Sequence, residues 1–359
     1  MQNNSKPSHL SFTAQRAAGY LLGFAILYAP FELYRRFLEN VLNVQPAFLP
    51  HAFCPRIPTA EIFTGGFFEL NNLMLVSTLL FWLLCLLFGP FFCGRLCVAG
   101  YFAESLSHLV PERWQIEWEK YVPVPYIRFG MLLGYMLLPL WYGFYPCAYC
   151  NFYLFDSLVS VLFGAAISFT VPLAATGFLY LVLFGLFTKG GRGYCRFICP
   201  QGAMQSLFFI IGSKLGIASK IQVNREKCVK CRLCVKNCPM RAMSLKNGSI
   251  KNDVSLCIKC GVCRHNCPVK AITTGRRQIM KKNALTTPKD KFLNLAVGAG
   301  IPFGTAASGA AGGCTGICGS CGSTCLGGFA LAAWLCGSVY FKRRRKSLTA
   351  AEKPQSVQP

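Results

Sequence analysis

The sequence predicts an α-helical polytopic membrane protein that carries a small, cysteine-rich α+β domain. Of the 359 residues, 53% are hydrophobic and only 13 are acidic. Four stretches without charged side chains approach or exceed the roughly 20 residues that cross a bilayer core. They lie at 17–31, 72–92, 129–147 and 157–188, with two further candidates at 293–313 and 324–341. Many of the 21 cysteines gather between residues 228 and 267, which indicates a separate metal-binding domain.

Two unbroken cysteine quartets carry the clearest chemical signal. Each has the spacing C-x2-C-x2-C-x3-C-P, and the runs close with Pro239 and Pro268. This is the two-cluster ferredoxin pattern, in which the fourth cysteine of each run ligates the other [4Fe-4S] cluster. Structural zinc usually uses separated C-x2-C pairs, so zinc and disulfides are weaker alternatives. The predicted ligand sets are Cys228, Cys231, Cys234 and Cys267 for cluster 1, and Cys257, Cys260, Cys263 and Cys238 for cluster 2.

A C-x3-C motif occurs twice in the apolar part, as Cys93 with Cys97 and as Cys195 with Cys199. In both copies a glycine follows seven residues after the first cysteine. The repetition predicts a duplicated unit whose two halves bring four thiols together, enough to ligate one further cluster. Two alternatives stay open: cysteines that serve as small apolar side chains, and a thiol/disulfide couple.

A glycine-rich segment near the C-terminus holds a third group of cysteines. Glycine allows the close backbone approach that wrapping a compact cluster would need. Glycine-mediated helix packing and disulfides are the alternatives. The segment predicts a hairpin of two helices with candidate ligands Cys314, Cys318, Cys321 and Cys325. Cys147 and Cys150 form a separate C-x2-C pair, and Cys54 precedes a proline.

The net charge of +24 is unevenly distributed. Between Lys189 and Lys291 there are 22 Lys or Arg residues against Glu226, Asp253 and Asp290. Positive charge gathers on the cytoplasmic side of membrane proteins, so we expect a cytoplasmic ferredoxin domain. No nucleic-acid-binding module is recognisable, so we expect no nucleic-acid partner. Membrane lipid and an acidic redox protein account better for the basic surface.

Taken together, the paired C-x3-C motifs and the ferredoxin quartets resemble the NapH-like membrane polyferredoxins over about residues 17–275. That group includes the quinol-oxidising membrane subunit of periplasmic nitrate reductase systems. The resemblance implies a bacterial inner-membrane, multi-pass electron carrier with quinone or quinol as a partner. One departure is Val98, where the group has a proline after the first motif.

The predicted fold class is therefore an α-helical polytopic membrane protein with a cytoplasmic ferredoxin-like (α+β) two-[4Fe-4S] domain. The predicted boundaries are 1–190 for four membrane helices with the first C-x3-C motif, 191–220 for the second motif and a connector, 221–275 for the ferredoxin domain, 276–292 for a basic linker, 293–342 for the cysteine-rich membrane hairpin and 343–359 for a polar tail.

The predicted function is electron relay between quinol or cytoplasmic donors and a partner redox protein. An assembly factor that delivers electrons to a metalloenzyme and a redox-sensing membrane regulator are the alternatives. No catalytic residue is indicated, although the chain could be the quinol-oxidising subunit of an oxidoreductase complex. Glu104 and His108, four residues apart, suggest a weaker hypothesis of a proton-handling pair.

Overall fold

The computed structural model describes residues 9–28, 30–41, 43, 58–59, 62, 72–142, 150–164, 171–276, 292 and 295–300. The longer helices are α1 (His9–Leu27), α2 (Leu33–Asn40), α4 (Asn72–Phe88), α6 (Val98–Ser107), α7 (Val124–Tyr142), α8 (Asn151–Leu162), α9 (Val171–Gly177), the π-helix η5 (Phe178–Leu186) and α11 (Pro200–Lys214). Short helical turns are α5 (Phe91–Arg95), η3 (Trp118–Lys120), α10 (Gly193–Phe197), α12 (Leu233–Lys236) and α13 (Val262–His265). The strands are β1 (Lys220–Val223), β2 (Met243–Lys246), β3 (Ser249–Asn252) and β4 (Ile272–Gly275).

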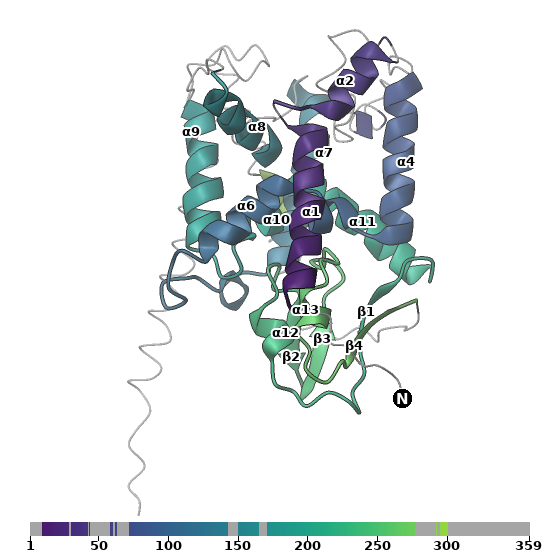
Figure 1. The fold of residues 1–359 in the computed structure, drawn as a ribbon, viewed down its shortest axis with the longest axis vertical. Helices are drawn as coiled ribbons and strands as arrows, with labels where there is room; N and C mark the ends of the chain where they lie inside the picture. The colour runs from purple at the N-terminus through teal and green to yellow at the C-terminus, as the bar shows by residue number, and fades with distance from the viewer. Residues whose placement is uncertain are drawn as a thin grey trace, which may run out of the picture.

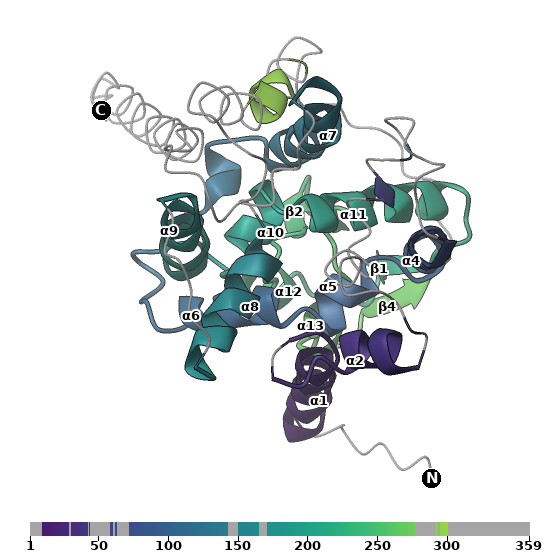
Figure 2. The ribbon, with the colours of Figure 1, turned by 90° about the horizontal axis from the view of Figure 1, so that it is seen from above.

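The helical part is built from two interlocked halves. In Figure 1, α1, α4 and α9 stand upright, while α6, α10 and α11 cross between them at mid-height. Helix α4, which precedes the first C-x3-C motif, packs against α11, which follows the second motif. Reciprocally, η5 precedes the second motif and packs against α6, which follows the first. Figure 2 shows the crossing helices from above, enclosed by the upright ones. This exchange confirms the duplicated unit that the sequence predicted.

Both motifs have the same local construction. Gly89 and Gly191, each four residues before the first cysteine of a motif, adopt φ values of 75° and 71°, which glycine reaches without steric cost. A short helical turn follows, and the second cysteine of each motif is the N-cap of the next helix: Cys97 for α6 and Cys199 for α11. Pro200 occupies the first turn of α11, where no backbone N–H is needed.

Helix α1 lies close to the first motif because its contact face carries two glycines. A Cβ atom on Gly19 would stand 2.8 Å from the carbonyl oxygen of Arg95. One on Gly23 would stand 2.0 Å from the carbonyl oxygen of Leu96, so no larger residue fits there. Near the start of the helix, Phe12 stacks on His265, with ring centroids 4.3 Å apart. Helix α1 therefore joins the helical part to the strand-containing domain.

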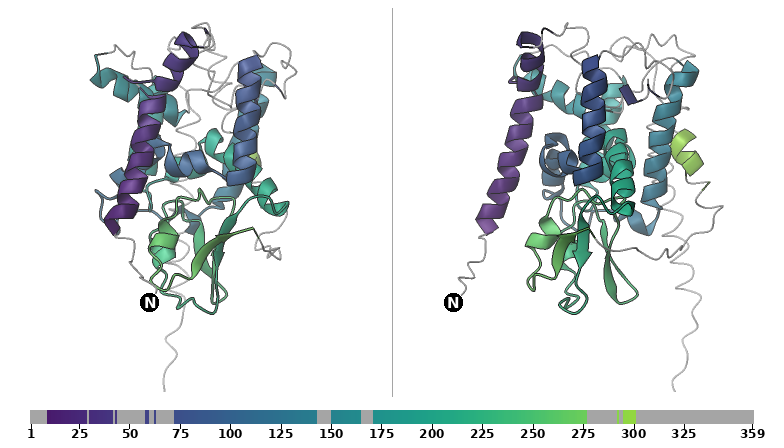
Figure 3. Two further views of the ribbon diagram at one scale, coloured as in Figure 1. Left: turned by 45° about the vertical axis from the view of Figure 1, so that its right-hand side comes forward. Right: turned by 90° about the vertical axis from the view of Figure 1, so that its right-hand side faces the viewer.

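Residues 220–275 form the ferredoxin module, seen at the lower end of both views in Figure 3. Strand β1 pairs antiparallel with β4, so the first and last segments of the module lie side by side. Strands β2 and β3 form a hairpin whose turn residues, Asn247 and Gly248, have φ values of 50° and 69°. Positive φ at both positions is the geometry that Asn-Gly favours in tight hairpins.

An acidic loop between α6 and α7 ties this module to the helices. Glu117 forms an ion pair with Lys189 at 2.8 Å and another with Arg241 of the ferredoxin module at 3.1 Å. Glu112 pairs with Lys236 of α12 at 3.1 Å. The partly exposed loop thus contacts the module through charges of opposite sign.

The predicted polytopic membrane fold is wrong. None of the helices in the described residues combines the length and the apolar character needed to cross a membrane. Helix α4 has 17 residues, and the stretch at 157–188 is divided among α8, α9 and η5. Helices α1 and α7 are 19 residues long but include Arg16 and Arg128 respectively. The expected inner-membrane location is therefore left without support.

Several large apolar side chains nevertheless remain exposed on the outer helices. Examples are Leu21 and Leu22 on α1, and Val76 and Leu80 on α4. The predicted linker and hairpin lie almost wholly outside the described residues, and the predicted tail lies entirely outside them.

Candidate iron–sulfur centres

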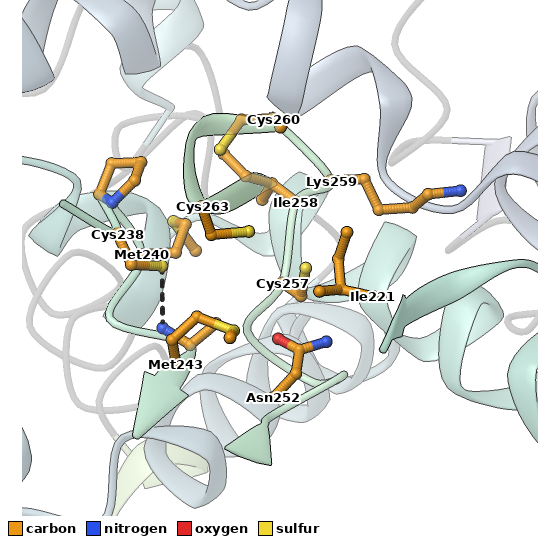
Figure 4. Close-up of a pocket in the computed structure, with 13 residues that line it drawn as sticks. Ile221, Cys238, Met240, Met243, Asn252, Cys257, Ile258, Lys259, Cys260 and Cys263 are labelled. Atoms are coloured by element: carbon orange, nitrogen blue, oxygen red, sulfur yellow. Dashed lines mark hydrogen bonds between the residues drawn. The ribbon is translucent and has the colours of Figure 1, made fainter. Parts of the chain in front are cut away.

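The first centre is a cavity in the ferredoxin module of about 340 Å³, open space at its mouth included. Figure 4 shows the labelled Cys238, Cys257, Cys260 and Cys263 around it, while the side chain of Lys259 points away. Lys259 donates instead to the carbonyl oxygen of Phe88 at 2.8 Å. Three of the cysteines come from the second quartet and Cys238 from the first, which is the set predicted for cluster 2.

The second centre is a cavity of about 330 Å³ in the same module. Its walls include all four cysteines of the set predicted for cluster 1, Cys228, Cys231, Cys234 and Cys267. The two cavities are neighbours, because the thiols of Cys234 and Cys263, one from each cavity, interact electrostatically. Each cavity is thus lined by three cysteines of one quartet and the fourth cysteine of the other. That these cysteines ligate the clusters stays a prediction.

The two quartets share an unusual backbone conformation. Lys230 and Lys259, each just before the second cysteine of its quartet, have φ values of 55° and 52°. The residue after that cysteine is also left-handed: Arg232 at 62° and Gly261 at 84°. Non-glycine residues rarely adopt this conformation, and successive turns of this kind direct backbone N–H groups toward an enclosed anion.

Backbone amides donate to the sulfur atoms in both cavities. The N–H of Ala242 donates to Sγ of Cys238, and that of Ala271 to Sγ of Cys267, each at 3.3 Å. The matching residues Arg241 and Lys270, three positions after the fourth cysteine, have φ values of 51° and 49°. Such N–H to sulfur bonds favour the anionic, iron-bound form of a thiolate and tune the reduction potential of a cluster.

The two cavities differ in depth. Cys238, Cys257 and Cys263 are buried, whereas Cys231 of the other cavity is exposed. Burial raises the pKa of the Cys257 thiol to about 12 and that of Cys260 to about 11. Without metal these thiols would be protonated at neutral pH, and binding iron would release the protons.

Both cavities fit the cofactor that the quartets predicted. Each has four thiol donors from two segments, amides that donate to sulfur, and space between the donors. Within the described part of the chain, no three His, Cys, Asp or Glu side chains converge on one point that suits a single metal ion. The donors surround a volume instead, as ligands of a multi-atom cluster do.

The structure also gathers the four thiols of the C-x3-C motifs. Cys93 interacts electrostatically with Cys97, Cys195 and Cys199, although the two motifs lie about a hundred residues apart. Cys93, Cys195 and Cys199 are buried. Burial raises the pKa of both Cys97 and Cys195 to about 11. Gln205 of α11 donates to Sγ of Cys93 at 3.1 Å, which links the two motifs directly.

A buried ion-pair network lies beside these thiols, and the sequence reasoning missed it. Arg192, 1% exposed, donates to Glu104 at 2.8 Å, to the hydroxyl oxygen of Tyr20 at 2.9 Å and to the carbonyl oxygen of Cys93 at 2.7 Å. Arg16 donates to the same carboxylate at 3.0 Å. Burial alone would raise the pKa of Glu104, but Arg192 and Arg16 outweigh it and the pKa is lowered.

This network corrects the hypothesis of a Glu104–His108 proton-handling pair. Glu104 is buried between two arginines, while His108 is exposed at the end of α6. The only sequence signal for the network is Arg16, a lone cation within an apolar helix.

Cys150 is the N-cap of α8, and its sulfur accepts from the backbone N–H of Tyr153 at 3.3 Å. It also interacts electrostatically with Cys97. Its predicted partner Cys147 lies outside the described residues, as do Cys54 and the cysteines of the C-terminal segment, Cys314, Cys318, Cys321 and Cys325.

Comparison with protein families supports this geometry. Residues 227–272 match the family model described as a 4Fe-4S dicluster domain. Residues 70–117 and 170–218 both match the model of a 4Fe-4S binding domain. This chain is an iron–sulfur protein. The dicluster match covers all eight quartet cysteines, and the protein holds two [4Fe-4S] clusters. The second model matches each half of the duplicated unit, with one C-x3-C motif in each match.

The curated relatives are distant. An uncharacterized protein of Methanocaldococcus jannaschii is 29% identical over 175 residues, covering 44% of this iron–sulfur protein and 62% of the relative. The "Putative electron transport protein YccM" of Escherichia coli is 22% identical over 193 residues, covering 50% of each chain. This chain thus spans less than two thirds of either relative.

These matches support an iron–sulfur protein of the electron-transfer type. The narrower resemblance to NapH-like membrane polyferredoxins stays a prediction. No solved structure matches the chain.

Proposed function

We propose that this iron–sulfur protein relays single electrons between a reductant and a partner redox protein. The observation that carries the proposal is the graded burial of the two neighbouring cavities. The cavity of Cys231 reaches the surface, whereas the cavity of Cys257 lies deep and borders the helical part. Iron–sulfur clusters supply one-electron chemistry, and an exposed centre beside a buried one suits relay better than storage.

The ligand assignment belongs to this proposal. Cys228, Cys231, Cys234 and Cys267 would hold the cluster near the surface, and Cys257, Cys260, Cys263 and Cys238 the deeper one. The protein would tune both through N–H to sulfur bonds, burial and nearby positive charge.

The surface around Cys231 supports a docking site for an acidic redox protein. Val229 is 62% exposed and Leu233 41% exposed beside the cavity, giving the patch an apolar centre. Exposed cations surround that centre, namely Lys227, Lys230, Arg232 and Lys270. A basic rim attracts an acidic partner and accelerates its encounter at low ionic strength.

The test is the rate at which an acidic ferredoxin or flavodoxin exchanges electrons with the purified holoprotein in stopped-flow measurements. Lys230→Glu with Arg232→Glu should slow the second-order rate about tenfold at low salt, and high salt should remove most of the difference. Arg113→Glu with Lys214→Glu, which reverses two exposed cations of the helical part, is the charge-matched control. Equal slowing in both double variants would contradict docking at Cys231.

The donor is a separate question within this proposal. Quinol and a cytoplasmic donor are the two candidates that the sequence suggested. Anaerobic mixing with a short-chain quinol analogue distinguishes them, because reduction of the clusters by the analogue alone would favour quinol. Failure of every small or protein donor to reduce the clusters would contradict the relay itself.

A further inference from the structure

We propose that Cys93, Cys97, Cys195 and Cys199 ligate a third iron–sulfur cluster, held between the two halves of the helical part. The proposal adds a site to the relay and does not depend on the identity of its donor or partner. Four neighbouring thiols alone would also suit a packed apolar core. The charges around them decide between a cluster site and simple packing.

The strongest observation is the guanidinium of Arg128 in α7. Its side chain is 1% exposed, and its Nη1 donates to the carbonyl oxygen of Ser255 at 2.8 Å. Its Nε and Nη2 are buried without a hydrogen-bond partner among the described residues. The groups that interact electrostatically with Arg128 are Cys93, Cys199 and Cys195, followed by Asp253.

A buried cation with two unpaired donors is costly unless an anion faces it. If the four thiols were only packing, they would be neutral and Arg128 would lack its main counter-charge. A cluster held by four thiolates is anionic and would supply that charge. The buried arginine is therefore better explained by a cluster than by neutral thiols.

The glycines at matching positions allow an arginine guanidinium to lie beside the sulfurs. A Cβ atom on Gly100 would stand 3.4 Å from Sγ of Cys195 and 2.9 Å from Nη1 of Arg192. One on Gly202 would stand 3.9 Å from Sγ of Cys199 and 3.0 Å from Nη2 of Arg128. Each glycine lies seven residues after the first cysteine of its own motif, so the duplicated unit admits a guanidinium at the matching place twice.

The backbone adds partial positive charge from two sides. Cys97 and Cys199 cap the N-termini of α6 and α11, and the sulfur of Cys97 accepts from the backbone N–H of Gly100. Helix N-termini stabilise thiolates next to them. With Arg128 and Arg192, the thiols face positive charge from four elements of the fold.

The donor set favours a cluster over a single ion. Among the described side chains the four sulfurs do not converge on one point, which argues against mononuclear zinc or iron. The same holds for the quartet cysteines, although their module is matched as a two-cluster domain. As each thiol binds iron it loses one proton, so assembly at this site releases four.

The decisive measurement is the iron and acid-labile sulfide content of the full-length protein, purified anaerobically, with Mössbauer spectra of the iron-57 form. We expect about twelve irons per chain rather than about eight, at four per cluster. About eight irons, with both ferredoxin clusters fully occupied, would overturn the proposal.

Variants then locate the additional iron. Cys93→Ser with Cys195→Ser should lower the content by about four irons and leave the ferredoxin EPR signals intact. Cys85→Ser is the matched control, because Cys85 is a buried thiol of α4 whose pKa is raised by burial alone, to about 12. Unchanged iron in the double variant would also refute the site. If the double variant does not accumulate, the iron content of the unaltered protein still decides.

Discussion

Gly94 lies directly against the backbone of Ile258: a Cβ atom on Gly94 would stand 2.2 Å from the carbonyl oxygen of Ile258. The same atom would be 3.4 Å from the backbone nitrogen of Cys260. The first C-x3-C turn and the second ferredoxin quartet therefore touch with no side chain between them. The deeper ferredoxin cavity and the four-thiol site are adjacent through this contact.

Gly94→Ala should separate these two backbones. Because neither can move without disturbing its own cysteines, we expect a loss of about 2 kcal/mol in unfolding free energy and an altered EPR signal of the deeper cluster. Denaturant unfolding and EPR of the same sample measure both. Gly300→Ala is the control, since a Cβ there meets nothing within 4 Å. Equal behaviour of the two variants would show that the contact is unimportant.

Cys238→Ser should damage the cluster held mainly by the second quartet, although Cys238 belongs to the first. It lines the cavity of Cys257, Cys260 and Cys263, and the cavity of Cys228 does not include it. Cys267→Ser should have the opposite effect. EPR of the two reduced variants, with iron content, identifies which cluster is lost. Loss of the Cys228 cluster in the Cys238 variant would rule out crossing ligands.

Glu104→Gln should destabilise the protein by about 3 kcal/mol, because Arg16 and Arg192 would lose their buried counter-charge. The pKa of Glu104 is lowered from its ordinary value of 4.5. Its stabilising contribution is therefore complete above pH 4.5 and is lost as the pH falls through the lower value of the folded state.

Urea unfolding at several pH values between 3 and 7 tests this expectation. The difference between the unaltered protein and the variant should shrink toward the acid end. Glu226→Gln, which alters an exposed carboxylate, should change stability by less than about 0.5 kcal/mol. A difference that is independent of pH would show that the Glu104 charge is not what stabilises the network.

The effect of Arg128→Met on unfolding free energy should depend on whether the proposed third cluster is present. In the holoprotein it removes the cation that faces the proposed cluster, and we expect a loss of about 3 kcal/mol. In the Cys93→Ser, Cys195→Ser background it removes a buried unpaired charge, and we expect little loss or a gain. The measurement is thermal unfolding of four proteins: the unaltered protein, Arg128→Met, the Cys93→Ser, Cys195→Ser double variant, and the combination of all three changes. The same loss in both backgrounds would contradict a charge interaction between Arg128 and the site.

Ligand spacing constrains the chain locally, and the cysteines that line each cavity are grouped as the crossed pattern predicts. Which cysteines ligate which cluster stays a prediction. Three cysteines within seven residues can reach only one cluster, and the proline-closed fourth must reach the other. The gathering of Cys93 with Cys195 was predictable for a similar reason, since a repeated motif implies a repeated structure that packs on itself. These inferences needed little knowledge of distant contacts.

The apolar stretches led to the wrong prediction of a polytopic membrane fold, because hydropathy shows neither where helices end nor which charges are buried. Arg16 lies inside α1 and Arg192 caps α10, where partners distant in the sequence compensate for their burial. Arg16 pairs with Glu104, 88 positions away, and Arg192 contacts Tyr20, 172 positions away. One sequence without its contacts cannot show that such cations are satisfied, so the polar network in the core could not be foreseen.

The exchange of helices between the two halves has a consequence for symmetry. Half a chain could complete its packing only against a second copy, and such a two-fold dimer would carry identical side chains on both sides of its thiols. A single chain that contains both halves can carry different side chains on the two sides. Arg192 lies three residues before Cys195, and the matching residue before Cys93 is Pro90. Glu104 lies in the first half, and the matching residue of the second half is Ser206. Among the described residues the Arg192–Glu104 pair therefore has no symmetric copy on the other side of the thiols. A site between two similar halves thus has an asymmetric electrostatic environment.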